Sequence, residues 1–436
     1  MSRLPLPAGL VAAAAAVVIT AAITAAITVG LTAQAPLPDA AAPLFDDALL
    51  QDIHLLINSR DWETLKATFS TDTYYPADFR WRDQVVRNVG IRSRGNGSRS
   101  GVKPGLRIDF DRYSTKQKLL GLKSVVLRNN IQDPSHLHER LGMQFFTRMG
   151  LPAPRELHAR LFVNNTYAGL YTVVEAVDRA FLERTFGEDK GYLFDYDYDP
   201  AVPPYYLDYR GADPSSYVPG PFKPATNERD PRPEIIERMI YTINVVAAPA
   251  FRSAIDEYLD VRGFVRYVAV ETFLADTDGF LGDYGMNNYY LYRPPQTNQF
   301  TFIPWDKSHA FTGIPEASIW HNILDVAPAN RNRLMTRLLE YPDLRELFLA
   351  TLEDAARSAS EITSAGTVSW LEGELDRQVL QIRDAVLADQ ARPDSNEAFE
   401  AAVESIRDFA RRRPQLVMAE AARARLAALG ASRRSR

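Results

Sequence analysis

The chain of 436 residues contains no cysteine. That absence excludes disulfide bonds, thiol catalysis and thiolate metal sites. The chain also lacks a basic excess, with 50 Lys and Arg against 55 Asp and Glu and a formal net charge of −5. A protein built mainly to bind nucleic acid needs a basic surface to neutralise phosphates, so we expect no nucleic-acid partner.

Histidine is scarce, with six residues in the chain. Only His136 and His138 are closely spaced, and two residues on a helix point to different sides of it. The sequence also lacks a Gly-x-Ser-x-Gly nucleophile motif. These absences disfavour histidine-ligated metal sites and serine hydrolases. The hydrophobic content of 46% indicates a globular protein with a sizeable core.

Charge is almost absent from the first 35 residues. Arg3 is followed by an uncharged run over residues 8–32 and then by Ala33-Gln34-Ala35, a small-x-small cleavage pattern. The run is long enough to span a bilayer, so a cleaved signal peptide (1–35) and a retained anchor through residues 8–32 both remain open. Either one predicts an extracytoplasmic protein, whether secreted, periplasmic or membrane-anchored facing outward. Residues 36–44 read as a Pro- and Ala-rich linker.

The order of hydrophobic patterns predicts an α+β fold. Leu50, Ile53 and Leu56 are spaced as in a helix, within a helical stretch predicted over residues 46–66 and broken near 58–61. Two hairpins are predicted, one across Asn164-Asn165 and one joining residues 288–292 to 300–304. The remaining expected strands and helices are strands at 85–94, 106–110 and 124–127, and helices at 134–149, 179–186, 232–246, 258–275 and from 332 to the end.

Acidic and amide side chains gather around the second of these hairpins. Asp283 and Asn288 are five residues apart, the separation of the catalytic acid and the metal-binding amide in protein kinases. Asp306 directly follows the apolar strand at 302–305, where kinases place a magnesium ligand. By spacing, Asp283 is the candidate base, and Asp306 and Asn288 are the candidate ligands of Mg²⁺ or Mn²⁺. Ordinary turn and cap roles would also account for these residues.

A glycine-rich loop over residues 94–101 is the second candidate feature. Its backbone amides could bind phosphates, although a plain hairpin turn explains it equally well. The candidate residues of the loop are Gly95, Asn96, Gly97 and Ser98. Lys103 and Arg107 follow the loop, and either could place a cation on a phosphate.

Two further acids occupy suggestive positions. Glu139 lies in the predicted helix after the third strand, where a kinase carries the acid that pairs with the phosphate-binding cation. A solvated helix face is the alternative for Glu139. Glu175 ends a predicted strand where an inter-lobe hinge would lie, or it is an exposed strand end.

Four segments of the sequence, in order and at similar spacing, resemble the spore-coat protein H (CotH) kinase family. The resemblance covers roughly residues 45–315. The segments are RSRGNGSRSGVKPGLRIDFDRY, GLKSVVLRNNIQDPSHLHERL, MGLPAPRELHARLFVNNTYAGLYTVVEAVDRAFLERTFG and TDGFLGDYGMNNYYLYRPPQTNQFTFIPWDKSHAF.

The resemblance implies an atypical protein-kinase-like fold of two lobes, a small N-terminal sheet lobe and a larger helical lobe, followed by a helical C-terminal region. The implied boundaries are a kinase-like domain over 45–320 (N-lobe about 45–175, C-lobe about 176–320) and a helical region over 321–436. The resemblance also implies an activity, the transfer of the ATP γ-phosphate to Ser or Thr of a surface or envelope protein. ATP and Mg²⁺ or Mn²⁺ would be the cofactors.

Residue by residue, Asp306 and Asn288 resemble the metal-binding pair. Lys103 or Arg107 resembles the phosphate-binding cation, and Glu139 its partner.

The resemblance leaves the catalytic base between two acids, since local context favours Asp278 and spacing favours Asp283. Ser308 stands where many relatives carry a second acid. Two alternatives to a protein kinase follow. One is a non-catalytic CotH-like envelope protein, and the other is a metal-dependent hydrolase of phosphate esters that uses the same ligands with water as the acceptor.

Overall fold

The computed structural model describes residues 39–197, 199, 205–283, 285–327, 331–362 and 367–434. The predicted signal peptide or anchor (1–35) and residues 36–38 of the predicted linker lie outside the described residues. Residues 40–436 form one compact unit. None of the helices in the described ranges is both long and apolar enough to cross a membrane.

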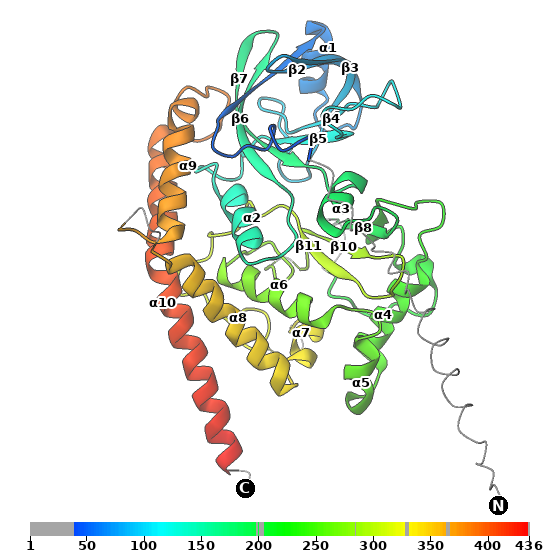
Figure 1. The fold of residues 1–436 in the computed structure, drawn as a ribbon, viewed down its shortest axis with the longest axis vertical. Helices are drawn as coiled ribbons and strands as arrows, with labels where there is room; N and C mark the ends of the chain where they lie inside the picture. The colour runs from blue at the N-terminus through cyan, green and yellow to red at the C-terminus, as the bar shows by residue number, and fades with distance from the viewer. Residues whose placement is uncertain are drawn as a thin grey trace, which may run out of the picture. The chain divides into compact units, whose positions relative to one another are not determined.

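The first third of this unit forms a closed seven-stranded barrel (Figure 1). Its strands follow the order β1-β2-β3-β4-β5-β7-β6, and a parallel pairing of β1 with β6 closes it. The strands are β1 Gln51–Ile57, β2 Tyr75–Trp81, β3 Gln84–Ser93, β4 Leu106–Asp109, β5 Ser124–Arg128, β6 Glu156–Val163 and β7 Thr166–Glu175. Closure leaves no free sheet edge, so the expectation of a simple sheet lobe is wrong.

The misjudged element is β1. Ile53, Leu55 and Ile57 are buried at every second position. Leu56, which the helical spacing places on the buried face of a helix, is 46% exposed. A period of two is that of a strand. The predicted helix over residues 46–66 is therefore wrong in its first half, and the helix α1 (Ser59–Ala67) begins after Asn58, whose side chain caps it.

A second, four-stranded antiparallel sheet follows the barrel, in the order β11-β10-β8-β9. Its strands are β8 Tyr192–Tyr196, β9 Phe222–Pro224, β10 Tyr289–Arg293 and β11 Thr301–Pro304. The predicted hairpin of β10 and β11 is confirmed. So is the β6–β7 hairpin, because Asn164 and Asn165 both adopt the left-handed conformation that a tight two-residue turn requires, with φ of 51° and 66°.

Helices complete the unit. They are α2 His138–Arg148, α3 Arg179–Phe186, α4 Glu234–Val245, α5 Ala248–Ile255, α6 Val261–Phe273, α7 Arg333–Leu338, α8 Pro342–Ser360, α9 Trp370–Leu387 and α10 Asn396–Arg434, with a 3₁₀ turn at Pro214–Ser216. The helix predicted at 134–149 begins later than expected, and Asp133 accepts a hydrogen bond from the amide of His138 at its start.

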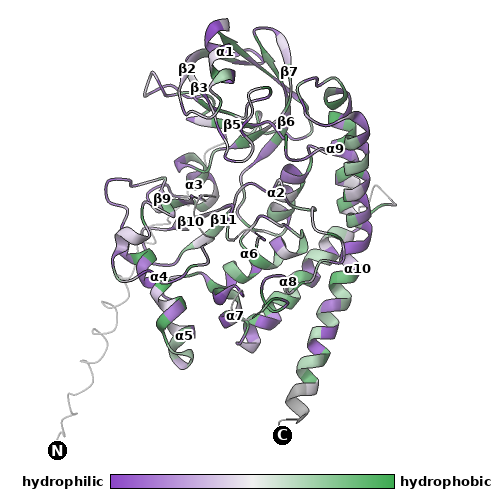
Figure 2. Ribbon diagram, turned by 180° about the vertical axis from the view of Figure 1, so that it is seen from behind, coloured by the Kyte–Doolittle hydropathy of each residue, from purple (hydrophilic) through white to green (hydrophobic). Residues whose placement is uncertain are grey.

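The C-terminal helices share the core of the preceding helices. α8 packs against both α6 and α10, and one hydrophobic cluster runs from Leu137 in the α2 region to Ala424 in α10. Figure 2 shows α9 and α10 striped with hydrophobic and hydrophilic residues, the pattern of helices that bury one side. The C-terminal helices thus stabilise the fold around α2, which carries Glu139, and around α6, which precedes Asp278.

Candidate active site

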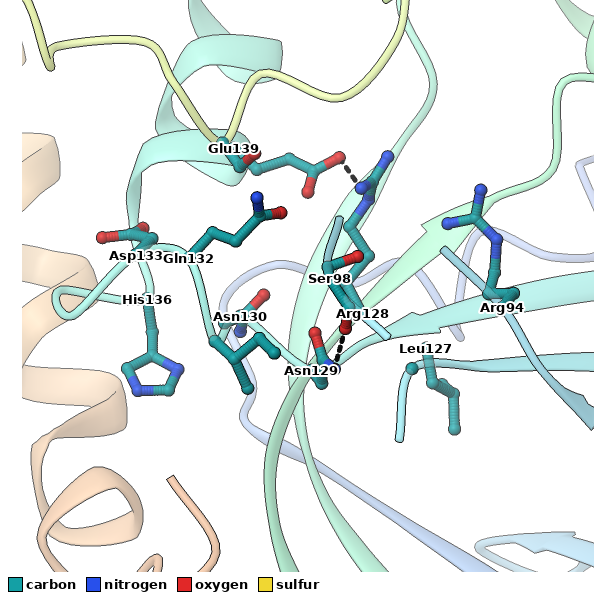
Figure 3. Close-up of a pocket in the computed structure, with 13 residues that line it drawn as sticks. Arg94, Ser98, Leu127, Arg128, Asn129, Asn130, Gln132, Asp133, His136 and Glu139 are labelled. Atoms are coloured by element: carbon teal, nitrogen blue, oxygen red, sulfur yellow. Dashed lines mark hydrogen bonds and ion pairs between the residues drawn. The ribbon is translucent and has the colours of Figure 1, made fainter. Parts of the chain in front are cut away.

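An arginine that the sequence did not single out lies at the centre of the candidate site. Arg128 ends β5 and is 8% exposed. Its Nε lies 2.6 Å from Oε1 of Glu139 in the first turn of α2, a contact drawn in Figure 3. Its Nη1 donates to Oδ2 of Asp306, directly beyond β11. Arg128 therefore joins the helix of Glu139 to the predicted metal-binding carboxylate.

The two predicted phosphate-binding cations are engaged elsewhere. Lys103 Nζ lies 2.7 Å from Asp389 Oδ2, and both side chains are fully buried. Arg107 donates to Asp109 Oδ1 at 2.7 Å and to Ser124 at 3.1 Å. The structure thus pairs Glu139 with Arg128 instead of with either predicted cation. The available signal was an arginine closing the apolar strand Ser124–Arg128, just before the helix of Glu139.

The charges at this bridge shift one another's protonation. Burial alone would raise the pKa of Asp306, but attraction to Arg128 and hydrogen bonds from Ser308 and Arg128 lower it to about 2. Burial raises the pKa of Glu139 to about 7 against the opposing attraction of Arg128. Burial and the neighbouring Glu139 raise the pKa of Glu156 well above its ordinary value. Asp306 is therefore ionised at neutral pH, whereas burial disfavours ionisation of both Glu139 and Glu156.

Arg94 and Ser98 of the glycine loop line a pocket that Arg128 also lines. Gly95 adopts a φ of +117°, which favours glycine, and the amide of Arg94 donates to Gly105 across the base of the loop at 2.9 Å. Asn129 holds the loop from below by donating to the carbonyls of Ser98 and Lys103, both at 2.8 Å. Residues of the loop and of the β5–α2 connection therefore line one pocket, in which Ser98 lies beside Asn129 (Figure 3). Of the predicted loop residues, Ser98 lines it, whereas Asn96 and Gly97 are exposed.

Two arginine side chains bring positive charge to this pocket. Arg94 and Arg128 both line it, and their guanidinium carbons lie 5.6 Å and 5.0 Å from the centroid of the Trp305 ring. Burial and the nearby Arg128 lower the pKa of Arg94 to about 10, so it stays charged at neutral pH. Nη2 of Arg128 is buried and has no hydrogen-bond partner in the described part of the chain. Two close cations, one with an unused donor, fit an anionic ligand such as a phosphate group.

Asp278, and not Asp283, accompanies the predicted metal-binding amide. Asn288 donates its Nδ2 to Oδ2 of Asp278 at 2.9 Å, and Asn287 donates to Oδ1 at 3.1 Å. Burial raises the pKa of Asp278, and the charge of Asp306 is among the groups that contribute. Asp283 is 46% exposed and contacts His321 Nε2 at 2.6 Å. The preference for Asp283 drawn from spacing is therefore not supported by the geometry, which favours Asp278.

Asn288 and Asp306 occupy corresponding ends of the β10–β11 hairpin. The amide of Trp305 donates to the carbonyl of Asn288 at 3.1 Å, one step beyond the Tyr289–Pro304 register pair. Both Asn288 (φ 59°) and Asp306 (φ 47°) adopt left-handed backbone conformations. Such conformations are uncommon for residues other than glycine and cluster at functional sites.

The donor chemistry at this hairpin end fits a hard divalent ion. Asp306 offers carboxylate oxygens, and Asn288 directs its amide nitrogen at Asp278, which leaves its amide oxygen for another partner. Mg²⁺ is commonly held by one or two protein oxygens together with substrate phosphates and water. Among the described residues, no group of three or more His, Asp or Glu side chains converges to hold a metal.

The last predicted site residue, Glu175, is buried at the end of β7. Arg155 and Arg184 contact its two oxygens at 2.7 Å and 2.6 Å. It is therefore not an exposed strand end. Its two arginine partners fix the start of the chain that leads from the barrel to α3.

Comparisons with known proteins place the chain in a family. The chain is 25% identical over 365 residues to the inner spore coat protein H of Bacillus subtilis (strain 168), covering 83% of this chain and 94% of that protein. Its structure aligns with the Helicobacter pylori proinflammatory kinase CtkA over 73% of this chain and 94% of that one, at 10% identity and a TM-score of 0.27, too low to support structural conclusions. The family model of the CotH kinase protein matches residues 91–417, most of the chain and every candidate site residue described above, and the protein therefore belongs to the CotH kinase family.

Proposed function

We propose that this protein is a metal-dependent phosphotransferase that moves the γ-phosphate of ATP to Ser or Thr of an envelope or surface protein. The observation that carries the proposal is the ionic bridge from Glu139 through Arg128 to Asp306, beside the glycine-loop pocket. Phosphoryl transfer requires little covalent chemistry from a protein, and it depends on cations placed at the phosphates and on a positioned base.

In this proposal Arg128 and Arg94 bind the phosphates beneath the glycine loop. Asp306 and Asn288 would hold the divalent ion, which when bound neutralises charge on the phosphates. Glu139 keeps Arg128 extended into the pocket, as the acid of a kinase helix does for its lysine.

Asp278 is the base in this proposal. Its carboxylate accepts two amide hydrogen bonds that fix its orientation, and burial raises its pKa from the ordinary value. A raised pKa makes a carboxylate a better acceptor for the proton of an attacking hydroxyl. We further infer an extracytoplasmic location, supported by the uncharged run over residues 8–32 and by the coat location named for the Bacillus relative.

The direct test incubates the purified full chain with γ-labelled ATP, Mg²⁺ or Mn²⁺ and a basic protein rich in Ser and Thr. Labelled acceptor is expected from the parent, and none from the Asp306→Ala variant. A parent that neither transfers label nor binds ATP contradicts the proposal. Equal activity in the Asp306→Ala variant contradicts the site.

A non-catalytic binding protein is the second candidate, favoured by Asp306 already being engaged by Arg128 and Ser308. Thermal unfolding separates the two, since ligand at 100 times its Kd stabilises a protein by about 2.7 kcal/mol. ATP with metal is expected to raise Tm. No change in Tm favours the binding protein, and release of free phosphate without labelled acceptor favours a hydrolase.

A further inference from the structure

Directly after Asp306, the ammonium group of Lys307 is completely buried between two carboxylates. Its Nζ lies 2.6 Å from Oε1 of Glu271 in α6 and 2.9 Å from Oδ2 of Asp276, beyond the end of that helix. All three side chains are at most 3% exposed. A buried cation is tolerated only with such partners, since desolvation costs several kcal/mol per ion.

Each carboxylate divides its oxygens between Lys307 and the loop that carries Asp278. Asp276 gives its other oxygen, Oδ1, to the amide of Asp278 at 3.1 Å. Glu271 gives Oε2 to the amide of Phe280 at 2.7 Å. The amides of Asp278 and Phe280, at the two ends of this turn, are thus held by the two acids that Lys307 contacts.

Close packing leaves this arrangement little freedom. A Cβ added to Gly279 would overlap the side chain of Glu271, so the loop lies directly on that carboxylate. On the other side, a Cβ on Gly142 of α2 would lie 3.2 Å from Cβ of Lys307. Lys307 therefore lies where three segments meet, those that bear Asp306, Asp278 and Glu139.

We propose that Lys307 is a positioning residue that fixes the loop of Asp278 relative to Asp306. Its ammonium group is enclosed by Glu271 and Asp276 and acts through them. The catalytic part of this inference rests on the proposed phosphotransfer function, whereas the structural part can be measured without it.

Amide hydrogen exchange tests the structural part. In Lys307→Met, exchange at Asp278 and Phe280 is expected to rise at least tenfold. The matched control is Lys103→Met, which removes another fully buried lysine–aspartate pair, 2.7 Å long and remote in sequence from this loop. The control should raise exchange at residues 276–283 no more than its global destabilisation raises exchange at the other protected amides. Unchanged exchange in Lys307→Met, or an equal rise in both variants, overturns the proposal.

If Lys307→Met does not fold, Lys307→Met/Asp276→Asn replaces it. This double variant neutralises one of the two carboxylates that Lys307 contacts, which restores the net charge of the parent cluster, and it retains an oxygen for the amide of Asp278. The same two outcomes decide. Kinetics test the catalytic part, with kcat expected to fall at least tenfold, KM for ATP to stay within twofold, and Lys307→Arg to recover part of kcat. An unchanged kcat refutes positioning. A parent without phosphotransfer refutes the proposed function instead, and exchange still decides the role of Lys307.

Discussion

Replacement of Arg128 by methionine should destabilise the protein far more than removal of a surface arginine. The substitution preserves most of the apolar stem and leaves Glu139 and Asp306 without their shared counter-ion. Removing one partner of a buried ion pair costs about 3–5 kcal/mol. The shift of the Asp306 pKa from 3.8 to about 2 accounts for about 2 kcal/mol of that loss.

The loss should depend on pH with a definite sign. Asp306 has a lowered pKa in the folded parent, so its contribution is complete above the unfolded pKa and disappears as pH falls towards 2. Glu139, raised to about 7 even with Arg128 present, would rise further without it and penalise the variant most at high pH. Both effects make the gap between parent and variant largest at pH 8 and smaller as pH falls.

Urea unfolding of both proteins at pH 8, 7, 6 and 5 measures this gap. The control is Arg160→Met, which breaks an exposed pair with Asp52 and should cost less than about 1 kcal/mol at every pH. A loss for Arg128→Met no larger than for the control would refute the bridge. So would a gap that widens as pH falls.

Three other substitutions have expected outcomes. Lys103→Met should lower the free energy of unfolding by about 3–5 kcal/mol, because it removes the buried pair with Asp389, and the Kd for ATP should stay within twofold. A large loss of ATP affinity in the folded variant would instead show that Lys103 binds the phosphates. Asp278→Asn should lower kcat about 100-fold or more, as loss of a general base does, whereas Asp283→Asn should change kcat less than threefold. A larger loss of kcat in Asp283→Asn than in Asp278→Asn would instead identify Asp283 as the base, as its spacing from Asn288 predicts. Glu156→Gln should stabilise the protein relative to the parent by a margin that grows as pH rises above 5, by at most about 1.4 kcal/mol per pH unit. The reason is that the raised pKa of Glu156 makes folding of the parent take up a proton. Stability curves that run parallel with pH would contradict the raised pKa.

Locally encoded features could be predicted from the sequence. The Asn164-Asn165 turn follows from the tolerance of asparagine for positive φ, and the β10–β11 hairpin follows from its flanking apolar strands. Asn288 and Asp306 are candidates because they flank that hairpin. Glu139 is a candidate because it lies in the helix that follows a short apolar strand, as the acid of a kinase does. In each case the signal lies within a few residues of the feature.

Contacts between distant segments decided the remainder. The bridge from Arg128 to Asp306 spans 178 residues, and the pair of Lys103 with Asp389 spans 286. Spacing along the chain carries no information about which of several nearby cations meets a given carboxylate. Burial supplies that choice, because an ion removed from water must find a partner where the packed elements place one. The closed barrel was decided in the same way, by the parallel pairing of β1 with the distant β6.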